Sequence, residues 1–383
     1  MKIKQTLRKL LPICLIVRLK KIQDHNSKIV YNIGYTIGAQ PKVLVSYVNN
    51  FLFYNDISNC PGTSSENCSS IVSALIKLGC VVDVARYDCE EGLRSDYDYV
   101  IGQGSAFRLA SSLNPSAKRI LYLTENLPEL SFIKEQERID YFYERHGIQL
   151  KLTRSGKFFV KEDFDNLEAC VYIGNPSGVQ KFPNVRAFDL RPYGIINPLF
   201  DQSKRDYNTA RKRFFWIGSN GAVHKGLDIL LDVFSKHSEL ELYIIGLTEK
   251  DRRILRKQMG PNVKNYGYID SLTGVCFSNL VTECGFVILP SCSEGIPTSV
   301  ITGMNHGLIP LVTKETNLEA PTGEIFSDYL VETIEDAIIR WSNKDVDYLA
   351  LQSEQTRHYA LKTFGNEQYS KRIEEILTEI IRP

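Results

Sequence analysis

The sequence carries almost no surplus charge, since 46 basic and 45 acidic residues give a formal net charge of +1. This balance argues against a protein that binds nucleic acid through its overall charge. Nine cysteines are present, but they form no CxxC pair and no zinc-type spacing with histidine. We therefore expect reduced thiols in a cytoplasmic protein and no metal site, and we interpret the even spacing of Cys276, Cys284 and Cys292 as chance.

Long apolar runs are also missing near the start of the chain. The run over residues 10–17 is much shorter than the ~20 residues that span a bilayer, and no small-residue cleavage site follows it. Residues 1–22 instead carry seven Lys or Arg and no acid. Such a segment is either a frayed terminus in solvent or a peripheral anchor on an anionic membrane surface, such as the inner face of the plasma membrane.

A complete dinucleotide fingerprint is absent too. No predicted strand is followed by GxGxxG with an acid about 20 residues later, which argues against a dinucleotide-dependent oxidoreductase. The partial match GQGS, with Gly102, Gly104 and Ser105, is either a tight turn or a contact to phosphates or to an acceptor.

Three other polar features of the first half leave alternatives open. Glu125 and Asn126, within residues 124–127, follow a predicted strand and are either a strand-end turn or acceptor-side groups. His146 closes a predicted charged helix over residues 132–147 and is either a C-terminal cap charge or a catalytic group. Residues 49–67, rich in Asn, Gly, Pro and Ser, form another candidate acceptor-side loop.

The most informative stretch that is present covers residues 284–313. An apolar run over residues 285–289 predicts a central parallel strand, and small polar residues then lead into a predicted helix over residues 297–305. Gly307 precedes a second apolar run at residues 308–312. In an open α/β sheet, the loop after such a strand lies beside the positive end of the next helix, so this segment predicts a phosphate-binding crevice.

Glu294 and Gly295 stand in that loop, and SEGIPTSVITGMNHGLIPLVT resembles the donor-site signature of retaining, nucleotide-sugar-dependent glycosyltransferases with the GT-B fold, in particular family 4. The resemblance implies that Glu294 contacts donor-sugar hydroxyls. The family's ribose-binding glutamate, eight positions later, is replaced by Thr302. This replacement predicts that the donor is a deoxythymidine-diphosphate sugar, or at least that the protein discriminates weakly between deoxythymidine and uridine diphosphates, unless another residue supplies the ribose contact.

The resemblance extends to the loop after a predicted strand at residues 214–217. It implies that Lys225, followed by Gly226, neutralises the donor diphosphate, while the family's arginine is replaced by Ser219 and His224 cannot be assumed to substitute for it. Residues 267–269 match the place where the family packs the base. Glu294 and Lys225 are the expected catalytic residues, and the expected donor-binding residues are Gly218, Ser219, Asn220, Lys225, Gly226, Gly267, Tyr268, Ile269, Ser293, Glu294, Gly295, Ile296, Pro297, Thr298, Ser299 and Thr302.

The alternation of predicted strands and helices indicates an α/β protein with two Rossmann-like domains whose parallel sheets face each other across a cleft. We expect a basic segment at residues 1–35, an acceptor-binding domain at 36–205, a donor-binding domain at 206–360 and a helix at 361–383 that returns to the first domain. The polar residues 201–212 are predicted to link the domains, and residues 315–326 are predicted to form a polar loop.

These features predict a hexosyltransferase that moves a sugar from a nucleotide-diphosphate sugar to a glycan or lipid-linked acceptor in surface polysaccharide biosynthesis, with retention. We expect no cofactor, because the helix dipole and Lys225 can stabilise the departing diphosphate. Nucleic acid is not an expected partner. Because Ser219 and Thr302 replace charged family residues, a catalytically idle, glycosyltransferase-like binding subunit is the alternative.

Overall fold

The structure is a computed structural model that describes residues 28–35, 40–53, 63–174, 184–269 and 271–381. The basic segment at residues 1–22 and residues 54–62 of the predicted loop at 49–67 lie outside the described residues. The chain forms two compact units, one of residues 1–60 and 64–119 and the other of residues 61–63 and 120–383. Among the described residues, no helix is long and apolar enough to cross a membrane.

The first unit is built on a small sheet with the strand order β1-β3-β2-β4. Strand β2 pairs in parallel with both β3 and β4, while β1 pairs antiparallel with β3. The three parallel strands were predicted, and the edge strand β1 was not. The elements of this unit are β1 (Ile29–Ile33), β2 (Lys42–Tyr47), η1 (Asn50–Phe53), α3 (Ser64–Lys77), β3 (Val81–Arg86), β4 (Tyr99–Gly102) and α4 (Gly104–Leu113).

The second unit begins with β5 (Lys118–Leu123), whose first residues close the first unit, followed by α5 (Pro128–His146), η3 (Lys161–Phe164), β6 (Leu167–Tyr172) and β7 (Arg186–Asp189). Strands β5, β6 and β7 are neighbours in that order. The C-terminal helix α14 (Asn366–Ile381) contacts these strands, because the hydroxyls of Tyr122 and Tyr369 lie 2.9 Å apart and Arg186 pairs with Glu379 at 2.9 Å.

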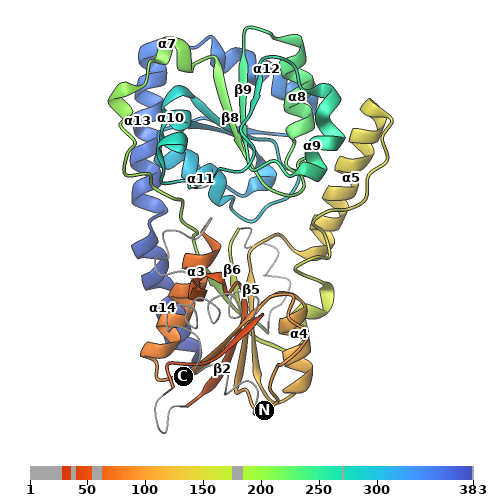
Figure 1. Ribbon diagram of the computed structural model, residues 1–383, viewed down its shortest axis with the longest axis vertical. Helices are drawn as coiled ribbons and strands as arrows, with labels where there is room; N and C mark the ends of the chain where they lie inside the picture. Colours follow the sequence, from red (N-terminus) through yellow and green to blue (C-terminus); the bar gives the residue numbers. More distant parts are fainter. Residues whose placement is uncertain (1–27, 36–39, 54–62, 175–183, 270, 382–383) are drawn as a thin grey trace, which may run out of the picture. The chain divides into compact units, whose positions relative to one another are not determined.

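The rest of the second unit surrounds a six-stranded sheet with the order β10-β9-β8-β11-β12-β13, and all of its neighbouring pairs are parallel. This confirms the predicted parallel sheet and its central strand, β11, which lies beside β8. Strands β8 and β9 of this sheet are labelled in Figure 1. The strands are β8 (Arg213–Ile217), β9 (Glu241–Ile245), β10 (Val263–Asn265), β11 (Phe286–Leu289), β12 (Ile309–Thr313) and β13 (Glu324–Phe326). The connecting elements are η4 (Gln202–Lys204), α7 (Tyr207–Ala210), α8 (Leu227–Lys236), α9 (Glu249–Leu255), η5 (Arg256–Gln258), α10 (Val275–Glu283), α11 (Thr298–Asn305), η6 (Lys314–Thr316), α12 (Val331–Ser342) and α13 (Val346–Thr363).

The core of this sheet follows the apolar pattern of the sequence. All residues of β11 are buried, and Phe286 stacks on Phe214 of β8 with ring centroids 4.7 Å apart. Four residues of α8 were predicted to face the core, and all four are fully buried: Leu227, Leu230, Leu231 and Phe234. Burial of one such side chain contributes about 1.5–3 kcal/mol, so this helix anchors the loop that precedes it.

Two polar segments are more ordered than the sequence indicated. The prediction of a polar loop at residues 315–326 was wrong at its end, because β13 pairs in parallel with β12 and buries Phe326. Three residues are too short to show a strand period. In residues 201–212, Arg205 is buried and its guanidinium donates to the carbonyls of His306 at 2.6 Å and Gly307 at 2.9 Å.

Candidate active site

The loop between β11 and α11 holds Glu294 in a fixed position. Its backbone N–H donates to the carbonyl of Glu315 at 3.0 Å, and the side-chain amide of Asn317 donates to the Glu294 carbonyl at 2.8 Å. Asn317 has a positive φ of 52°, a conformation that asparagine tolerates better than most residues. The Ser291 hydroxyl donates to an Oε1 of Glu294 at 3.1 Å. Both the backbone and the carboxylate of Glu294 are therefore oriented by neighbours.

The loop between β8 and α8 brings Lys225 to the same place. Gly226 has a φ of 72°, and a Cβ there would lie 2.2 Å from the carbonyl oxygen of Pro290, so a side chain would separate the two loops. The indole N–H of Trp216 donates to the Lys225 carbonyl at 3.2 Å, and the Lys225 N–H donates to the carbonyl of Gly221 at 3.0 Å. Together these contacts position the lysine side chain at the end of β11.

The Lys225 ammonium forms an ion pair with the Glu294 carboxylate, and both side chains are 8% exposed. Burial alone would raise the pKa of Glu294, but the charges of Lys225, Arg154 and His224 outweigh it and lower that pKa to about 2. The carboxylate therefore stays ionised at neutral pH. Desolvation of both charges offsets much of the attraction within a buried ion pair, so this pair is weak evidence for stability and is a candidate for a binding site.

His224 lies directly behind this pair and is fully engaged. One ring nitrogen, Nε2, lies 2.6 Å from the carbonyl oxygen of Ser293, and Nδ1 lies 3.5 Å from Cys292 Sγ and 3.7 Å from Glu135 Oε1. Burial lowers the pKa of His224, but Cys292 and Glu135 outweigh it and raise that pKa to about 10. The histidine thus connects internal groups and offers no free ring nitrogen to a ligand.

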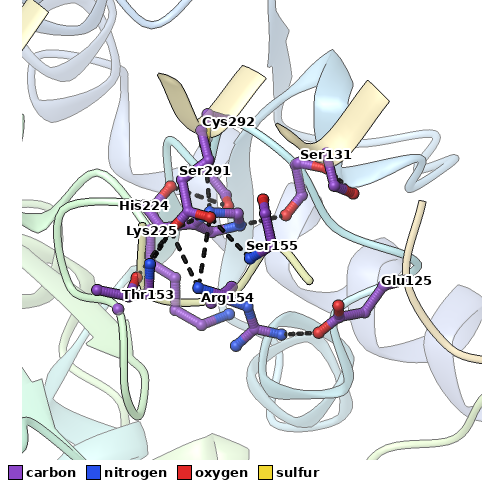
Figure 2. A network of polar contacts seen from close by, with 12 residues as sticks. Glu125, Ser131, Thr153, Arg154, Ser155, His224, Lys225, Ser291 and Cys292 are labelled. Carbon is purple, nitrogen blue, oxygen red and sulfur yellow. Dashed lines mark hydrogen bonds and ion pairs between the residues drawn. The ribbon is translucent and has the colours of Figure 1, made fainter. Parts of the chain in front are cut away.

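Several polar groups at this site were not predicted from the sequence (Figure 2). Arg154 pairs with Glu125 and is held by Glu135, which accepts hydrogen bonds from three consecutive backbone N–H groups at residues 153–155. Arg154 and Glu135 lie far from the recognised motif in sequence and stand in no pattern that marks them. Glu125 was predicted to be either a turn residue or an acceptor-side group, and in the structure its carboxylate pairs with the guanidinium of Arg154.

The polar residues after β5 contact the loop that carries Glu294. The Asn126 amide donates to the Ser293 hydroxyl at 3.1 Å, and the Ser131 hydroxyl lies 3.2 Å from the same oxygen. A Cβ on Gly295 would lie 2.4 Å from the carbonyl oxygen of Thr124 and 2.8 Å from that of Ile173. Glycine at 295 is therefore required by this close approach of backbone segments.

The remaining predicted positions are spread more widely. Ser219 is exposed, and Tyr268, which follows the edge strand β10 between Gly267 and Ile269, is 69% exposed. Thr302 is buried, and its hydroxyl donates to the Thr298 carbonyl at 2.7 Å and accepts from the Ile195 N–H at 3.1 Å. Gly218 and Asn220 lie in the loop that carries Lys225. The other predicted positions adjoin Glu294 in the loop before α11 or in the first turn of that helix: Ser293, Gly295, Ile296, Pro297, Thr298 and Ser299.

The GQGS segment and His146, for which the sequence left alternatives open, both have contacts that fit a local structural role. In the first unit, a Cβ on Gly102 would lie 2.0 Å from the Ser46 carbonyl oxygen, and Gly104 has a φ of 83°, which favours the tight-turn interpretation of GQGS. His146 occupies the last turn of α5 before Gly147, and its Nε2 lies 3.2 Å from Asp232. This contact favours the interpretation of His146 as a helix-end charge.

Residues 211–344 match the protein family described as Glycosyl transferases group 1. No curated protein was found as a sequence relative. Solved structures are similar over most of the chain. Sucrose-phosphate synthase from Thermosynechococcus elongatus matches with a TM-score of 0.62 and 11% identity over 89% of this chain and 99% of that one. HepE from Anabaena, in complex with UDP and glucose, matches with a TM-score of 0.56 and 13% identity over 88% and 99%.

Two further solved structures are also similar in fold at low sequence identity. WaaG, a glycosyltransferase involved in lipopolysaccharide biosynthesis, matches with a TM-score of 0.54 and 13% identity over 88% of this chain and all of that one. TarM from S. aureus matches with a TM-score of 0.51 and 14% identity, and this chain spans only 55% of its length. The chain therefore has the GT-B fold and carries a glycosyl transferases group 1 domain.

Proposed function

We propose that the protein transfers a sugar from a nucleotide-diphosphate sugar to a glycan or lipid-linked acceptor. The observation that carries the proposal is the buried Lys225–Glu294 ion pair, which lies at the ends of β8 and β11 inside the group 1 domain. A cation and a carboxylate at this place suit a ligand that presents an anionic diphosphate beside a sugar with several hydroxyls.

Lys225 would stabilise the negative charge that develops on the diphosphate when the bond to the sugar breaks. Its ammonium is buried and held by the turn before α8, so little reorganisation is needed as that charge forms. The first turn of α11 lies next to the loop with Glu294 and adds backbone N–H groups with the positive end of the helix dipole. The proposal needs no cofactor, and the nucleotide-sugar is a substrate.

Glu294 would accept hydrogen bonds from the hydroxyls of the donor sugar and so orient its anomeric carbon. The carboxylate stays ionised through its surrounding cations, which makes it a strong acceptor. Retention of configuration is part of the proposal and is supported by the resemblance around Glu294. A role in surface polysaccharide synthesis is supported by the lipopolysaccharide enzyme among the similar structures.

A binding subunit without turnover is the second candidate. Two observations favour it: Ser219 is exposed and uncharged where the resembled family carries an arginine, and the hydroxyl of Thr302 is used within the protein. Such a subunit would bind a nucleotide-sugar and transfer nothing. Binding and turnover must therefore be measured separately.

The test combines a thermal-shift panel of nucleotides and nucleotide-sugars with an assay of sugar transfer for the best ligand. A ligand at one hundred times its dissociation constant adds about 2.7 kcal/mol to stability. We expect turnover in the parent, loss of most turnover in Glu294→Gln, and parental turnover in Glu332→Gln, an exposed carboxylate on α12. Binding without turnover in the parent would favour the second candidate, and equal turnover in Glu294→Gln would remove Glu294 from the mechanism.

We further propose that the basic residues 1–22 place the enzyme on an anionic membrane surface. The seven positive charges, interleaved with Leu and Ile, support this interpretation. The full chain is expected to sediment with vesicles of anionic phospholipid, and a chain lacking residues 1–22 is expected to remain in the supernatant. Equal sedimentation of both chains would contradict the proposal.

A further inference from the structure

Residues 153–155, in the loop between α5 and η3, are fixed by one buried carboxylate. Glu135 of α5 is 1% exposed and accepts the backbone N–H groups of Thr153 at 2.8 Å, Arg154 at 3.1 Å and Ser155 at 2.8 Å. Its oxygen also accepts the Thr153 hydroxyl at 2.8 Å. Burial would raise the pKa of Glu135, but His224 and Ser155 outweigh it and lower that pKa. A charged acceptor with several donors holds this loop in one conformation.

The loop directs Arg154 toward the loop that contains Lys225. A Cβ placed on Gly221 would lie 3.2 Å from Cδ of Arg154, so the aliphatic part of the arginine runs along the turn before Lys225. Figure 2 shows its guanidinium turned toward the Glu125 carboxylate, with which it forms an ion pair. The Arg154 side chain is 17% exposed, so part of it reaches the surface even though its guanidinium is paired with Glu125.

The charge of Arg154 also acts on the Lys225–Glu294 pair. Burial lowers the pKa of Arg154, but the charges of Glu125 and Glu294 outweigh it and raise that pKa. Burial lowers the pKa of Lys225, and the positive charge of Arg154 lowers it further against the effect of Glu294. The two cations therefore share one electrostatic environment, and each has a carboxylate as its partner.

We propose that Arg154 is the second cation of the diphosphate site and binds the donor in place of the arginine that Ser219 replaces. Glu125 and Glu294 hold Arg154 and Lys225 while no donor is bound, and Glu135 is the positioning residue for Arg154. The inference rests on the proposed function and adds a binding residue to it.

The charges of the site allow a diphosphate to replace Glu125 and Glu294 as the partners of Arg154 and Lys225. Two carboxylates balance the two cations without a ligand, and a diphosphate brings comparable negative charge with more acceptor oxygens. A guanidinium binds phosphate oxygens through two parallel N–H groups, which a lysine cannot do. When the diphosphate takes over both cations, Glu294 becomes available to sugar hydroxyls. Glu125 is then a competitor of the ligand for Arg154.

If Glu125 competes with the ligand for Arg154, substitutions of these two residues should change ligand affinity in opposite directions. Binding of inorganic pyrophosphate and of uridine diphosphate is measured by calorimetry for the parent, Arg154→Gln, Glu125→Gln and the control Arg253→Gln, whose side chain on α9 is 77% exposed. We expect Arg154→Gln to weaken both ligands about tenfold or more, which equals about 1.4 kcal/mol. Glu125→Gln is expected to tighten both ligands severalfold, and Arg253→Gln to leave them within twofold of the parent.

Two further measurements separate ligand contact from support of the loop. The dependence of binding on salt concentration should become shallower in Arg154→Gln, because one charge no longer meets the phosphate. Arg154→Lys should restore part of the affinity, whereas a loop damaged by loss of packing would not be rescued. If Arg154→Gln does not fold, Arg154→Lys and Glu125→Gln decide the question with the same readouts.

The possible failures are distinguishable. A parent that binds neither ligand overturns the proposed function and this inference with it. If the parent binds both, Lys225→Met weakens binding and Arg154→Gln stays within twofold of the parent, the inference alone is overturned. Weaker binding in Glu125→Gln would likewise overturn it, since Glu125 would then support the site rather than compete with the ligand.

Discussion

The Lys225–Glu294 pair allows a prediction in which two substitutions at one contact have unequal effects. Removing one partner of a buried ion pair typically costs about 3–5 kcal/mol. In Glu294→Gln, the buried Lys225 ammonium loses its carboxylate while the positive charge of Arg154 still acts on it. In Lys225→Met, the Glu294 carboxylate keeps the Ser291 hydroxyl at 3.1 Å and the charges of Arg154 and His224.

We therefore expect the larger loss of stability in Glu294→Gln. Partial exposure and the remaining amide acceptor reduce that loss to about 2–3 kcal/mol, against about 1–2 kcal/mol for Lys225→Met. With about 2–4 °C in Tm per kcal/mol for a domain of this size, the Tm should fall by roughly 4–12 °C and 2–8 °C, respectively. The double variant should lose less stability than the sum of the two single losses, because it leaves neither charge of the pair without a partner.

The assay is thermal unfolding of the parent and three variants with and without saturating pyrophosphate, with Lys250→Met on α9 as an exposed control. Pyrophosphate should raise the Tm of Glu294→Gln more than that of the parent, because the anion then pairs with Lys225 without displacing a carboxylate. It should raise the Tm of Lys225→Met least. Equal increments in all proteins, or an unchanged Tm in Glu294→Gln without ligand, would refute this account of the pair.

Three other predictions follow from single contacts. The pKa of Glu294 is lowered from 4.5 to about 2, so its ionised form contributes stability that is complete above pH 4.5 and is lost as the pH falls toward 2. The urea midpoints of the parent and of Glu294→Gln should therefore converge in acid. A difference between the two midpoints that stays constant with pH would contradict this. Gly295→Ala should abolish ligand binding and lower the Tm, since its Cβ meets two carbonyl oxygens; parental binding would show that the backbone moves aside. Deoxythymidine and uridine diphosphates should bind the parent within tenfold of each other, because the Thr302 hydroxyl is used by Thr298 and Ile195; a stronger preference for uridine diphosphate would indicate another ribose contact.

The elements of the fold that could be predicted are those marked by runs of apolar residues in the sequence. The apolar runs around residues 285–289 and 308–312 became β11 and β12, and the intervening helix α11 begins at Thr298, directly after the expected loop. Such elements are specified by neighbours in the sequence, since a buried strand needs consecutive apolar residues. The edge strand β13 was missed because three residues in a polar context carry no such signal.

The missed site residues depend on contacts between distant segments. Glu135 meets His224 across 89 positions of sequence, the difference between those two residue numbers, and Arg154 meets the turn at Gly221 in the same way. No local period marks either residue, and an arginine in a Ser/Gly-rich loop is typical of exposed surface. The buried state of Glu135 could be known only from the fold, because a carboxylate is almost never buried without partners.

The proposed role of Arg154 gives a physical reason why Ser219 need not leave the diphosphate site without a second cation. A diphosphate requires positive charge within hydrogen-bond distance, whichever segment supplies it. His224 adjoins Lys225 in sequence, but its Nε2 is used by Ser293 and its Nδ1 faces Cys292 and Glu135. Arg154 comes from a different segment and remains partly accessible. Of these two cations among the described residues, we therefore propose Arg154, in the loop that Glu135 holds, rather than His224 as the second cation for the diphosphate.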